Sequence, residues 1–135
     1  MGFDNVFSDE ILELYKNPHN NGTIENPDLE VRGRSRVCGD HVRFQLKIEN
    51  GVIGDIKFSA YGCVVSTVSQ SVLTDIVKGL TVDDVMALKQ EELIKKVGKI
   101  PAFKIHCTYG LSVLKKGLEK WKQDPSVKTV DNIMV

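Results

Sequence analysis

The feature that most constrains this chain is a change of hydrophobic period near its middle. Between residues 42 and 60, apolar and polar side chains alternate on both sides of Asn50-Gly51. Such alternation is typical of strands with one buried face, and Asn-Gly accepts the positive φ angles of a tight hairpin turn. From Val64 to Lys78, apolar residues instead recur every three or four positions, which predicts a helix. The centre of the chain is therefore predicted to be an antiparallel hairpin followed by a long helix.

Weaker signals predict the remaining elements. In chain order they are a short helix capped near Ser8 and stopped by Asn17-Pro18, a loop over 17–27, a weak strand at Leu29–Val31, short helices over 81–88 and 91–97, and a last helix that begins near Cys107. Strands that precede helices, without βαβ alternation, favour an α+β fold with a small antiparallel three-stranded sheet and helices packed on it. We expect one domain over residues 1–135, with a core over about 7–123 and a C-terminal tail over 124–135.

Charge and hydropathy exclude several classes of protein. Eighteen basic residues balance eighteen acidic ones, so no net basic field exists to hold nucleic acid or an anionic membrane. The apolar runs are too short for a membrane span, and the first residues do not resemble a secretory signal. Three cysteines are an odd number, which speaks against a disulfide framework. We therefore expect a cytoplasmic protein that binds neither nucleic acid nor membrane.

The three cysteines lie at junctions between predicted elements. Cys38 lies in a turn before the hairpin, Cys63 at the start of the long helix, and Cys107 where an extended segment meets the last helix. Free N–H groups at a helix start lower a thiol pKa and favour thiolate, which is expected for Cys63 and Cys107. No CxxC pair is present, and scattered cysteines are often small buried apolar residues, so a core role stays open beside a ligand role.

Further candidate ligands lie beside the first and last cysteines. Asp40 follows Cys38 by two residues, and His106 is adjacent to Cys107. If the loops converge, three thiolates with a carboxylate or an imidazole complete a four-ligand shell that suits zinc or an iron–sulfur cluster and suits calcium or magnesium poorly. Lys104 would place a cation near the thiolates. The plainer alternatives are a turn residue, a structural histidine and a solvated lysine.

Two other patterns bear on function. Arg32, Arg34 and Arg36 form a basic cluster before the first cysteine, which is either a solvated loop or a surface for an acidic partner. No Ser-His-Asp constellation, P-loop or Gly-rich nucleotide fingerprint is present, so we do not expect a stand-alone enzyme.

The cysteine motifs occur in a recognisable order. They are Cys38-Gly39-Asp40, Gly62-Cys63 and Lys104-Ile105-His106-Cys107, accompanied by the Ile11–Pro18 opening, the Asn50-Gly51 turn and Val77-Lys78-Gly79. From about Phe7 to Gln123 the chain resembles the iron–sulfur cluster assembly scaffolds of the IscU/NifU type, whose domain is that of the NifU N-terminus. The resemblance implies the SufE/NifU-like scaffold fold.

The resemblance also implies a function and a role for each motif residue. A scaffold of this type receives sulfur from a cysteine desulfurase of the IscS/NifS type, builds a labile [2Fe–2S] cluster from iron and that sulfur, and transfers it to apo iron–sulfur acceptor proteins. The implied ligands are Cys38, Cys63 and Cys107, with Asp40 and His106 competing for the fourth place and zinc as an alternative metal in the cluster-free form. Cys107 would accept persulfide and Lys104 would assist ligand exchange. A homo-oligomer is compatible with the cluster-bound state.

The sequence departs from the family pattern at three places. Ser35-Arg36-Val37 stands where many relatives have an Asn-Pro turn, and Val64–Thr67 replaces a Gly-Ser-Ala run. The segment Ile100–Lys104 lacks one proline of the chaperone-recognition motif, which leaves an Hsp70-type partner open. The chain lacks the long insertion of the zinc-dependent SufU relatives and keeps His106, which favours scaffolding; zinc-bound sulfur transfer of the SufU type is the alternative.

Overall fold

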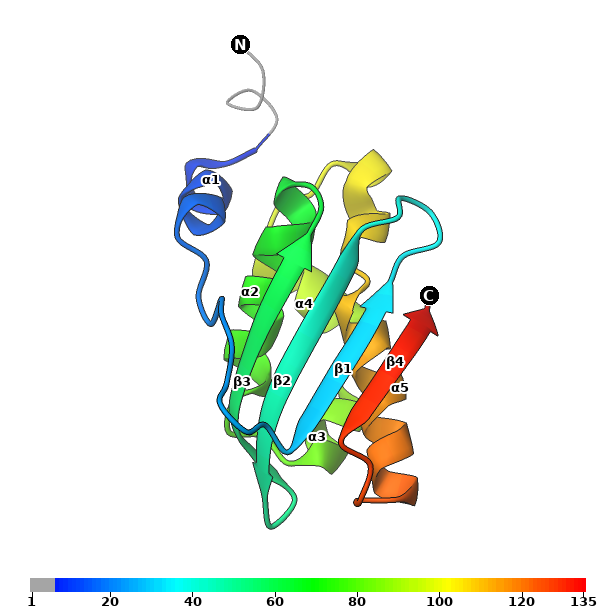
Figure 1. Ribbon diagram of the computed structural model, residues 1–135. Helices are drawn as coiled ribbons and strands as arrows, with labels where there is room; N and C mark the ends of the chain where they lie inside the picture. Colours follow the sequence, from blue (N-terminus) through cyan, green and yellow to red (C-terminus); the bar gives the residue numbers. More distant parts are fainter. Residues whose placement is uncertain (1–6) are drawn as a thin grey trace.

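The strands and helices form two layers (Figure 1). The computed structural model describes residues 7–135. The elements are α1 (Asp9–Lys16), β1 (Leu29–Arg34), β2 (His41–Glu49), β3 (Val52–Tyr61), α2 (Val64–Val77), α3 (Val82–Ala87), α4 (Gln90–Val97), the 3-10 helix η2 (Ala102–Cys107), α5 (Gly110–Gln123) and β4 (Thr129–Met134). The sheet has the order β3-β2-β1-β4, and α2, α4 and α5 lie against one of its faces. The α+β class expected from the sequence is confirmed.

The predicted hairpin forms the centre of the sheet. Asn50 and Gly51 have φ angles of 54° and 77°, as a tight turn between β2 and β3 requires. Antiparallel pairing places Phe44 opposite Phe58, and both side chains are buried. The period-two pattern therefore correctly predicts which face of each strand is buried in the core.

The sheet has four strands, whereas the sequence predicts three and assigns residues 124–135 to a tail. The extra strand is β4, which pairs in parallel with β1 and makes the sheet mixed. Its apolar residues Val130 and Ile133 lie opposite Val31 and Gly33, so three residues of β4 span the length of two on β1. This bulge, at which Asn132 has a φ of 60°, breaks the alternation that identifies a strand in a sequence.

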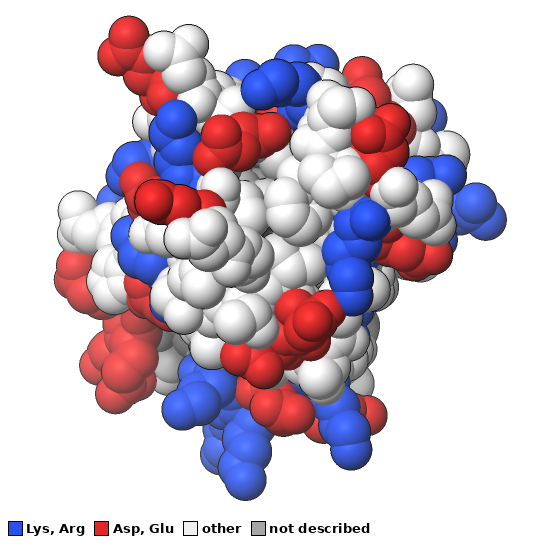
Figure 2. Space-filling view, turned by 90° about the horizontal axis from the view of Figure 1, so that it is seen from below, with Lys and Arg blue, Asp and Glu red and all other residues white. Residues whose placement is uncertain are grey.

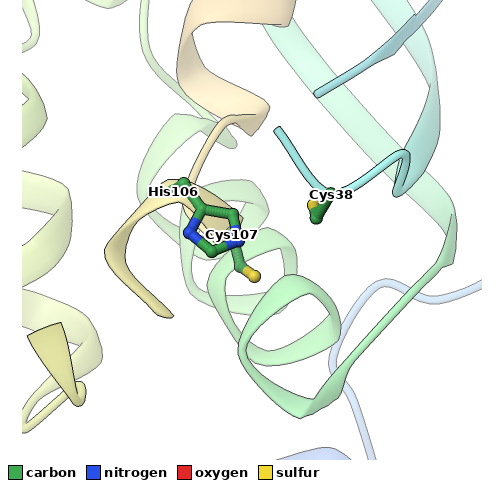
Figure 3. Close-up of side chains that lie close together, drawn as sticks. All are labelled: Cys38, His106 and Cys107. Atoms are coloured by element: carbon green, nitrogen blue, oxygen red, sulfur yellow. The ribbon is translucent and has the colours of Figure 1, made fainter. Parts of the chain in front are cut away.

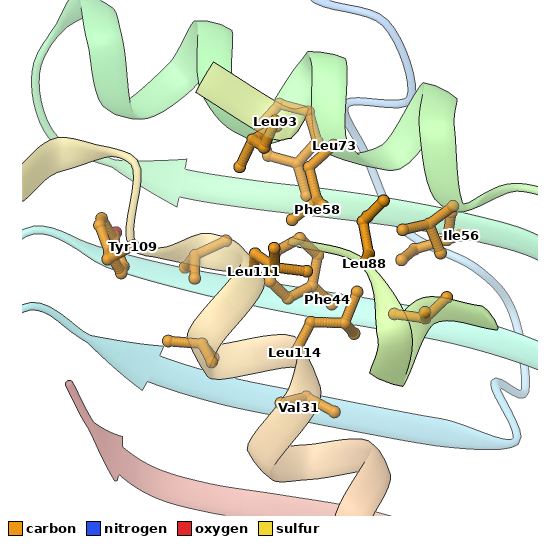
Figure 4. Close-up of a cluster of buried hydrophobic side chains, with 14 of the residues drawn as sticks. Val31, Phe44, Ile56, Phe58, Leu73, Leu88, Leu93, Tyr109, Leu111 and Leu114 are labelled. Atoms are coloured by element: carbon orange, nitrogen blue, oxygen red, sulfur yellow. The ribbon is translucent and has the colours of Figure 1, made fainter. Parts of the chain in front are cut away.

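Aliphatic and aromatic side chains from both layers form a continuous core (Figure 4). Phe44 and Phe58 from the sheet lie among Leu73 of α2, Leu93 of α4 and Leu111 of α5, and all five are fully or almost fully buried. At Gly117 of α5, a β-carbon would lie 2.5 Å from the Val31 side chain, so glycine allows α5 to approach β1 closely. This packing fixes the ends of the elements that carry the cysteines.

Charge on the surface is mixed in sign. Seen from the end of the molecule that carries the β2–β3 turn, basic and acidic side chains are interspersed around an uncharged centre (Figure 2). Among the helices of residues 7–135, none has the length and apolar content needed to cross a bilayer.

Candidate metal centre

Three chain segments that are distant in sequence meet at one end of the two-layer structure. They are the β1–β2 loop with Cys38, the β3–α2 junction with Cys63, and η2 with Cys107 (Figure 1). The Sγ atoms of Cys63 and Cys107 lie 3.2 Å apart. The structure thus brings together cysteines that no short sequence motif links.

All five predicted ligands are part of this convergence. One donor atom each from Asp40, Cys63 and Cys107 lies within 4.8 Å of the other two, and the same holds for Cys38, His106 and Cys107. Cys107 belongs to both groups and therefore lies between them. Figure 3 shows Cys38 facing the Cys107 sulfur across the gap between the β1–β2 loop and η2, with the His106 ring beside Cys107.

A tight turn presents Cys38 to solvent. The Ser35 N–H donates to the Asp40 carbonyl (2.9 Å), and the Gly39 N–H donates to the Ser35 carbonyl (3.0 Å). Gly39 has a φ of +75°, a conformation that other residues rarely adopt. Cys38 is accordingly exposed, Cys63 is half-buried and Cys107 is buried, so the centre opens on the Cys38 side.

Asp40 is held against the start of α2. Cys63 is the N-cap residue of this helix, and its N–H donates to Asp40 Oδ2 at 3.3 Å. A β-carbon on Gly62 would lie 2.3 Å from the Asp40 carboxylate, so only glycine leaves room for the carboxylate there. A carboxylate at a helix N-terminus is electrostatically favourable, and this position keeps the Asp40 oxygen next to two sulfurs.

The last cysteine differs from the sequence prediction in position and in acidity. Helix α5 begins at Gly110, and Cys107 instead ends η2, where it has no helix N-terminus to stabilise a thiolate. Burial raises the pKa of the Cys107 thiol, and its hydrogen bond with Cys63 and the nearby charges of Cys63, Cys38 and Asp40 raise it further. In the metal-free protein this thiol is therefore protonated at neutral pH, and a bound metal would displace its proton.

Helix α2 supports the Cys107 segment through contacts that the sequence does not reveal. Ser69 Oγ donates to the Cys107 carbonyl at 3.3 Å, and Ser66 Oγ lies 3.4 Å from the Tyr109 hydroxyl. Burial raises the pKa of Tyr109, so its hydroxyl stays neutral. These partners are separated by 38 and 43 residues, and no local pattern could have indicated them.

Lys104 is the one predicted site residue that the structure leaves apart. Among residues 7–135, no hydrogen bond or ion pair joins its ammonium to any of the five candidate ligands. Its ammonium lies 5.9 Å from the centre of the neighbouring Phe103 ring and is partly exposed. It is on the same short helix as His106 and Cys107.

The donor set determines which metals the centre can hold. Three thiols with one carboxylate and one imidazole form a predominantly soft set, which fits zinc or an iron–sulfur cluster and fits calcium or magnesium poorly. The fold and the donor set thus define a small α+β protein with a candidate site for a soft metal or a cluster at one end of its sheet. A family model described as the NifU-like N terminal domain matches residues 6–128. The chain belongs to this family.

Relatives and solved structures agree with this assignment. The chain is 35% identical over 108 residues to the iron-sulfur cluster assembly scaffold protein IscU of Escherichia coli, covering 76% of this chain and 83% of the relative. It is 33% identical over 130 residues to the iron sulfur cluster assembly protein 1, mitochondrial, of Debaryomyces hansenii, covering 91% of this chain and 72% of the relative. Among structures, a NifU-like N-terminal protein from Brucella abortus has the same fold, with a TM-score of 0.72 at 21% identity, covering 90% of this chain and 98% of that one.

Proposed function

We propose that the protein is a scaffold for the assembly of iron–sulfur clusters. Its cargo is a labile [2Fe–2S] cluster bound by Cys38, Cys63 and Cys107, with Asp40 or His106 as the fourth ligand. The observation that carries the proposal is the convergence of these five donors from three segments in a chain of the NifU-like N-terminal family. The names of the E. coli and D. hansenii relatives, both of which refer to iron–sulfur cluster assembly, support it.

The arrangement of the ligands suits temporary binding. Cys38 is exposed and lies on a surface turn, so this side of the centre can open without disturbing the core. A carboxylate is a harder ligand than a thiolate and holds iron less firmly in a mostly sulfur site. Asp40, if it is the fourth ligand, therefore makes the cluster easier to release to an apo acceptor protein.

Sulfur delivery would come from a cysteine desulfurase. In this step the Cys107 thiol first loses its proton to solvent, and the resulting thiolate attacks the outer sulfur of a persulfide on the desulfurase. The persulfide S–S bond breaks, and the desulfurase cysteine leaves as a thiolate. Cys107 is only 1% exposed, so η2 has to move before a partner's persulfide can reach it. Phe103, four residues before Cys107 on the same short helix, is 68% exposed, which makes η2 accessible to a partner, whether the desulfurase or an Hsp70-type chaperone.

The proposed function and the spacing of two cysteine sulfurs bear on whether the protein is an enzyme and on its compartment. The proposed activity is binding and transfer of cargo, and the protein is not proposed to be a stand-alone enzyme. Cys63 and Cys107 have sulfurs 3.2 Å apart, a pair that an oxidising compartment would convert to a disulfide at the cost of the metal centre. We therefore place the protein in a reducing compartment such as the cytoplasm.

The decisive experiment is anaerobic reconstitution of metal-free protein with ferrous iron, cysteine and a cysteine desulfurase, followed by visible and Mössbauer spectroscopy. A [2Fe–2S] signature with acid-labile sulfide is expected for the wild type. Cys→Ala at 38, 63 or 107 should abolish the stable cluster. In the presence of an apo acceptor protein, the cluster of Asp40→Ala should persist longer than that of the wild type. Asp84→Ala is the matched control, because Asp84 is an acidic residue on α3 outside the centre, and its cluster should persist no longer than that of the wild type. Normal assembly and transfer in all three cysteine variants would disprove the ligand assignment.

Zinc-bound sulfur transfer of the SufU type is the second candidate. The donor set of three thiols and one carboxylate or imidazole also satisfies tetrahedral zinc. A scaffold protein for the SUF system from Fervidobacterium islandicum AW-1 shares the fold, with a TM-score of 0.68 at 22% identity, covering 87% of this chain and 99% of that one. Strong acceleration of a cysteine desulfurase by the zinc-loaded protein, with persulfide on Cys107 and no cluster, would favour this candidate. Absence of any stimulation would exclude it.

A further inference from the structure

A basic hollow lies on the face of the sheet opposite the helices. Val31 of β1 packs against α5, so the neighbouring side chains of β1 point to the other face. Among residues 7–135 no helix covers that face (Figure 1). The segment before β1 crosses part of it, where the Ile24 N–H donates to the Gln45 side chain. The remaining surface forms a hollow of about 490 Å³, to which the cysteines do not contribute.

Six side chains form two rows across β1, β2 and β3 in this hollow. Read from β1 to β3, the rows are Arg34, His41, Tyr61 and Arg32, Arg43, Ser59. Residues two apart on a strand share a face, so both rows face the hollow that they line. The rings of His41 and Tyr61 are stacked, with centroids 5.1 Å apart and planes inclined by 6°.

The rows place like charges together. Arg32 and Arg43 are direct cross-strand partners, an arrangement that destabilises a sheet. Arg32 is compensated, because Glu30 accepts a hydrogen bond from its Nε at 2.6 Å and Asp131 lies 3.8 Å from its Nη1. Arg43 donates to the Ser59 hydroxyl at 3.2 Å, but it has no carboxylate partner.

Arg34 likewise has no carboxylate partner within 4 Å among residues 7–135, where only five ion pairs are present and none includes Arg34 or Arg43. Two guanidinium groups are thus uncompensated on a concave surface, in a chain with equal numbers of acidic and basic residues. Asp131 also lines the hollow, 3.8 Å from Arg32, so three arginines face a single carboxylate there. A concave wall with net positive charge concentrates anionic ligands.

We propose that this hollow binds a compact polyanion that carries phosphate or carboxylate groups. Arg34 and Arg43 would form the charged contacts, because the planar guanidinium donates paired hydrogen bonds to either group. The Tyr61 hydroxyl is a further donor on the same wall, whereas the Ser59 hydroxyl donates to the Gly22 carbonyl at 3.4 Å. The volume lies within the range of small-molecule sites.

The position of the hollow connects it to the metal centre in space. His41 follows Asp40 directly, and Tyr61 precedes Gly62-Cys63. A bound anion would therefore lie beside two of the three segments that carry the cysteines. The proposal does not depend on cluster assembly, because no cysteine takes part in it and metal-free protein can be used to test it.

The test is titration of reduced, metal-free protein with pyrophosphate and, separately, with citrate at low ionic strength, followed by calorimetry and by the thermal unfolding midpoint. Saturable binding that raises the midpoint and weakens with added salt is expected. Arg34→Gln and Arg43→Gln should each weaken binding about tenfold or more, as expected for loss of a charged hydrogen bond. Tighter binding of pyrophosphate would identify a phosphate ligand, and tighter binding of citrate a carboxylate ligand.

Arg36→Gln is the matched control, since Arg36 is an exposed arginine in the β1–β2 loop and does not line the hollow. It should bind both anions as the wild type does. Without anion, Arg43→Gln should unfold at a midpoint no lower than that of the wild type, because it relieves the opposition with Arg32. Failure of both anions to bind would overturn the proposal. Equal binding by wild type, Arg34→Gln and Arg43→Gln would overturn it as well.

Discussion

At the scale of single residues, the geometry of the candidate metal centre depends on a glycine as much as on the proposed ligands. Gly62 has no side chain, and this leaves the space that the Asp40 carboxylate occupies beside the Cys63 N–H. The sequence motif Gly62-Cys63 indicated a close approach of some group, but it could not show that the group is Asp40. That relation exists only because β2 and β3 are paired so that His41 lies opposite Tyr61.

Gly62→Ala is predicted to displace Asp40 without unfolding the protein. The added β-carbon would lie 2.3 Å from the Asp40 carboxylate carbon and 2.8 Å from the Asp40 β-carbon, so the carboxylate has to rotate away and the backbone has to shift, at a cost of about 1–3 kcal/mol in unfolding free energy. Chemical denaturation should show a folded protein with this reduced stability, while the reconstituted cluster should persist longer, as in Asp40→Ala. Gly54→Ala is the control, because a β-carbon there meets no atom within 4 Å. A cluster lifetime equal to that of the wild type would show that Asp40 is not a ligand.

At the scale of elements, the strand that the sequence missed supports the loop that carries Cys38. The Arg36 N–H donates to the Val135 carbonyl at 2.8 Å, and the Val135 N–H donates to the Arg34 carbonyl at 3.1 Å. These bonds extend the β1–β4 pairing into the loop. The bulge at Asn132 that hid β4 from pattern analysis thus belongs to an element that fixes one side of the metal centre.

Val135→Pro is predicted to loosen this loop. Proline removes the N–H that bonds to Arg34, and loss of a backbone hydrogen bond of about 1 kcal/mol corresponds to roughly fivefold faster exchange. Hydrogen exchange at residues 35–39 should therefore accelerate, while exchange in α2 should not change.

Met134→Pro is the control for this experiment, because alternate residues of a strand point their N–H groups away from the neighbouring strand. Its effect on residues 35–39 should be smaller. Unchanged exchange in Val135→Pro would mean that the Cys38 loop is held by its own turn alone.

The elements that were predicted well have strong local signals. The Asn-Gly turn and the helix over 64–78 were found because their periods are regular over many residues. The sequence places the start of the last helix near Cys107, whereas α5 begins three residues later at Gly110, because the 3-10 helix that precedes it has no hydrophobic period of its own.

At the scale of the whole molecule, the core is built almost entirely without the proposed metal ligands. The helices and the sheet enclose a continuous set of buried aliphatic and aromatic side chains, and of the three cysteines only Cys107 is among them. The sequence predicted this set through its periods, but it could not predict that the three loops would meet, because that follows from how the layers pack.

Removal of metal is predicted to leave a folded protein. After treatment with a chelator under reducing conditions, thermal unfolding should remain cooperative. Added zinc should raise the midpoint, and above the dissociation constant the rise should follow the logarithm of the free zinc concentration. In Cys63→Ala the same zinc should have little effect. Loss of the cooperative transition in the metal-free wild type would indicate a structural metal instead.

The spacing of the cysteines has a consequence for how mutations elsewhere affect cargo binding. Cys38, Cys63 and Cys107 are separated by 25 and 44 residues, so in an unfolded chain the three thiols are far apart and do not form a common binding site. The measured association constant for the proposed cluster or metal is then the association constant of the folded protein multiplied by the fraction of molecules that are folded. Substitutions in the distant core will leave cargo loading almost unchanged until stability approaches zero, and loading will then fall steeply.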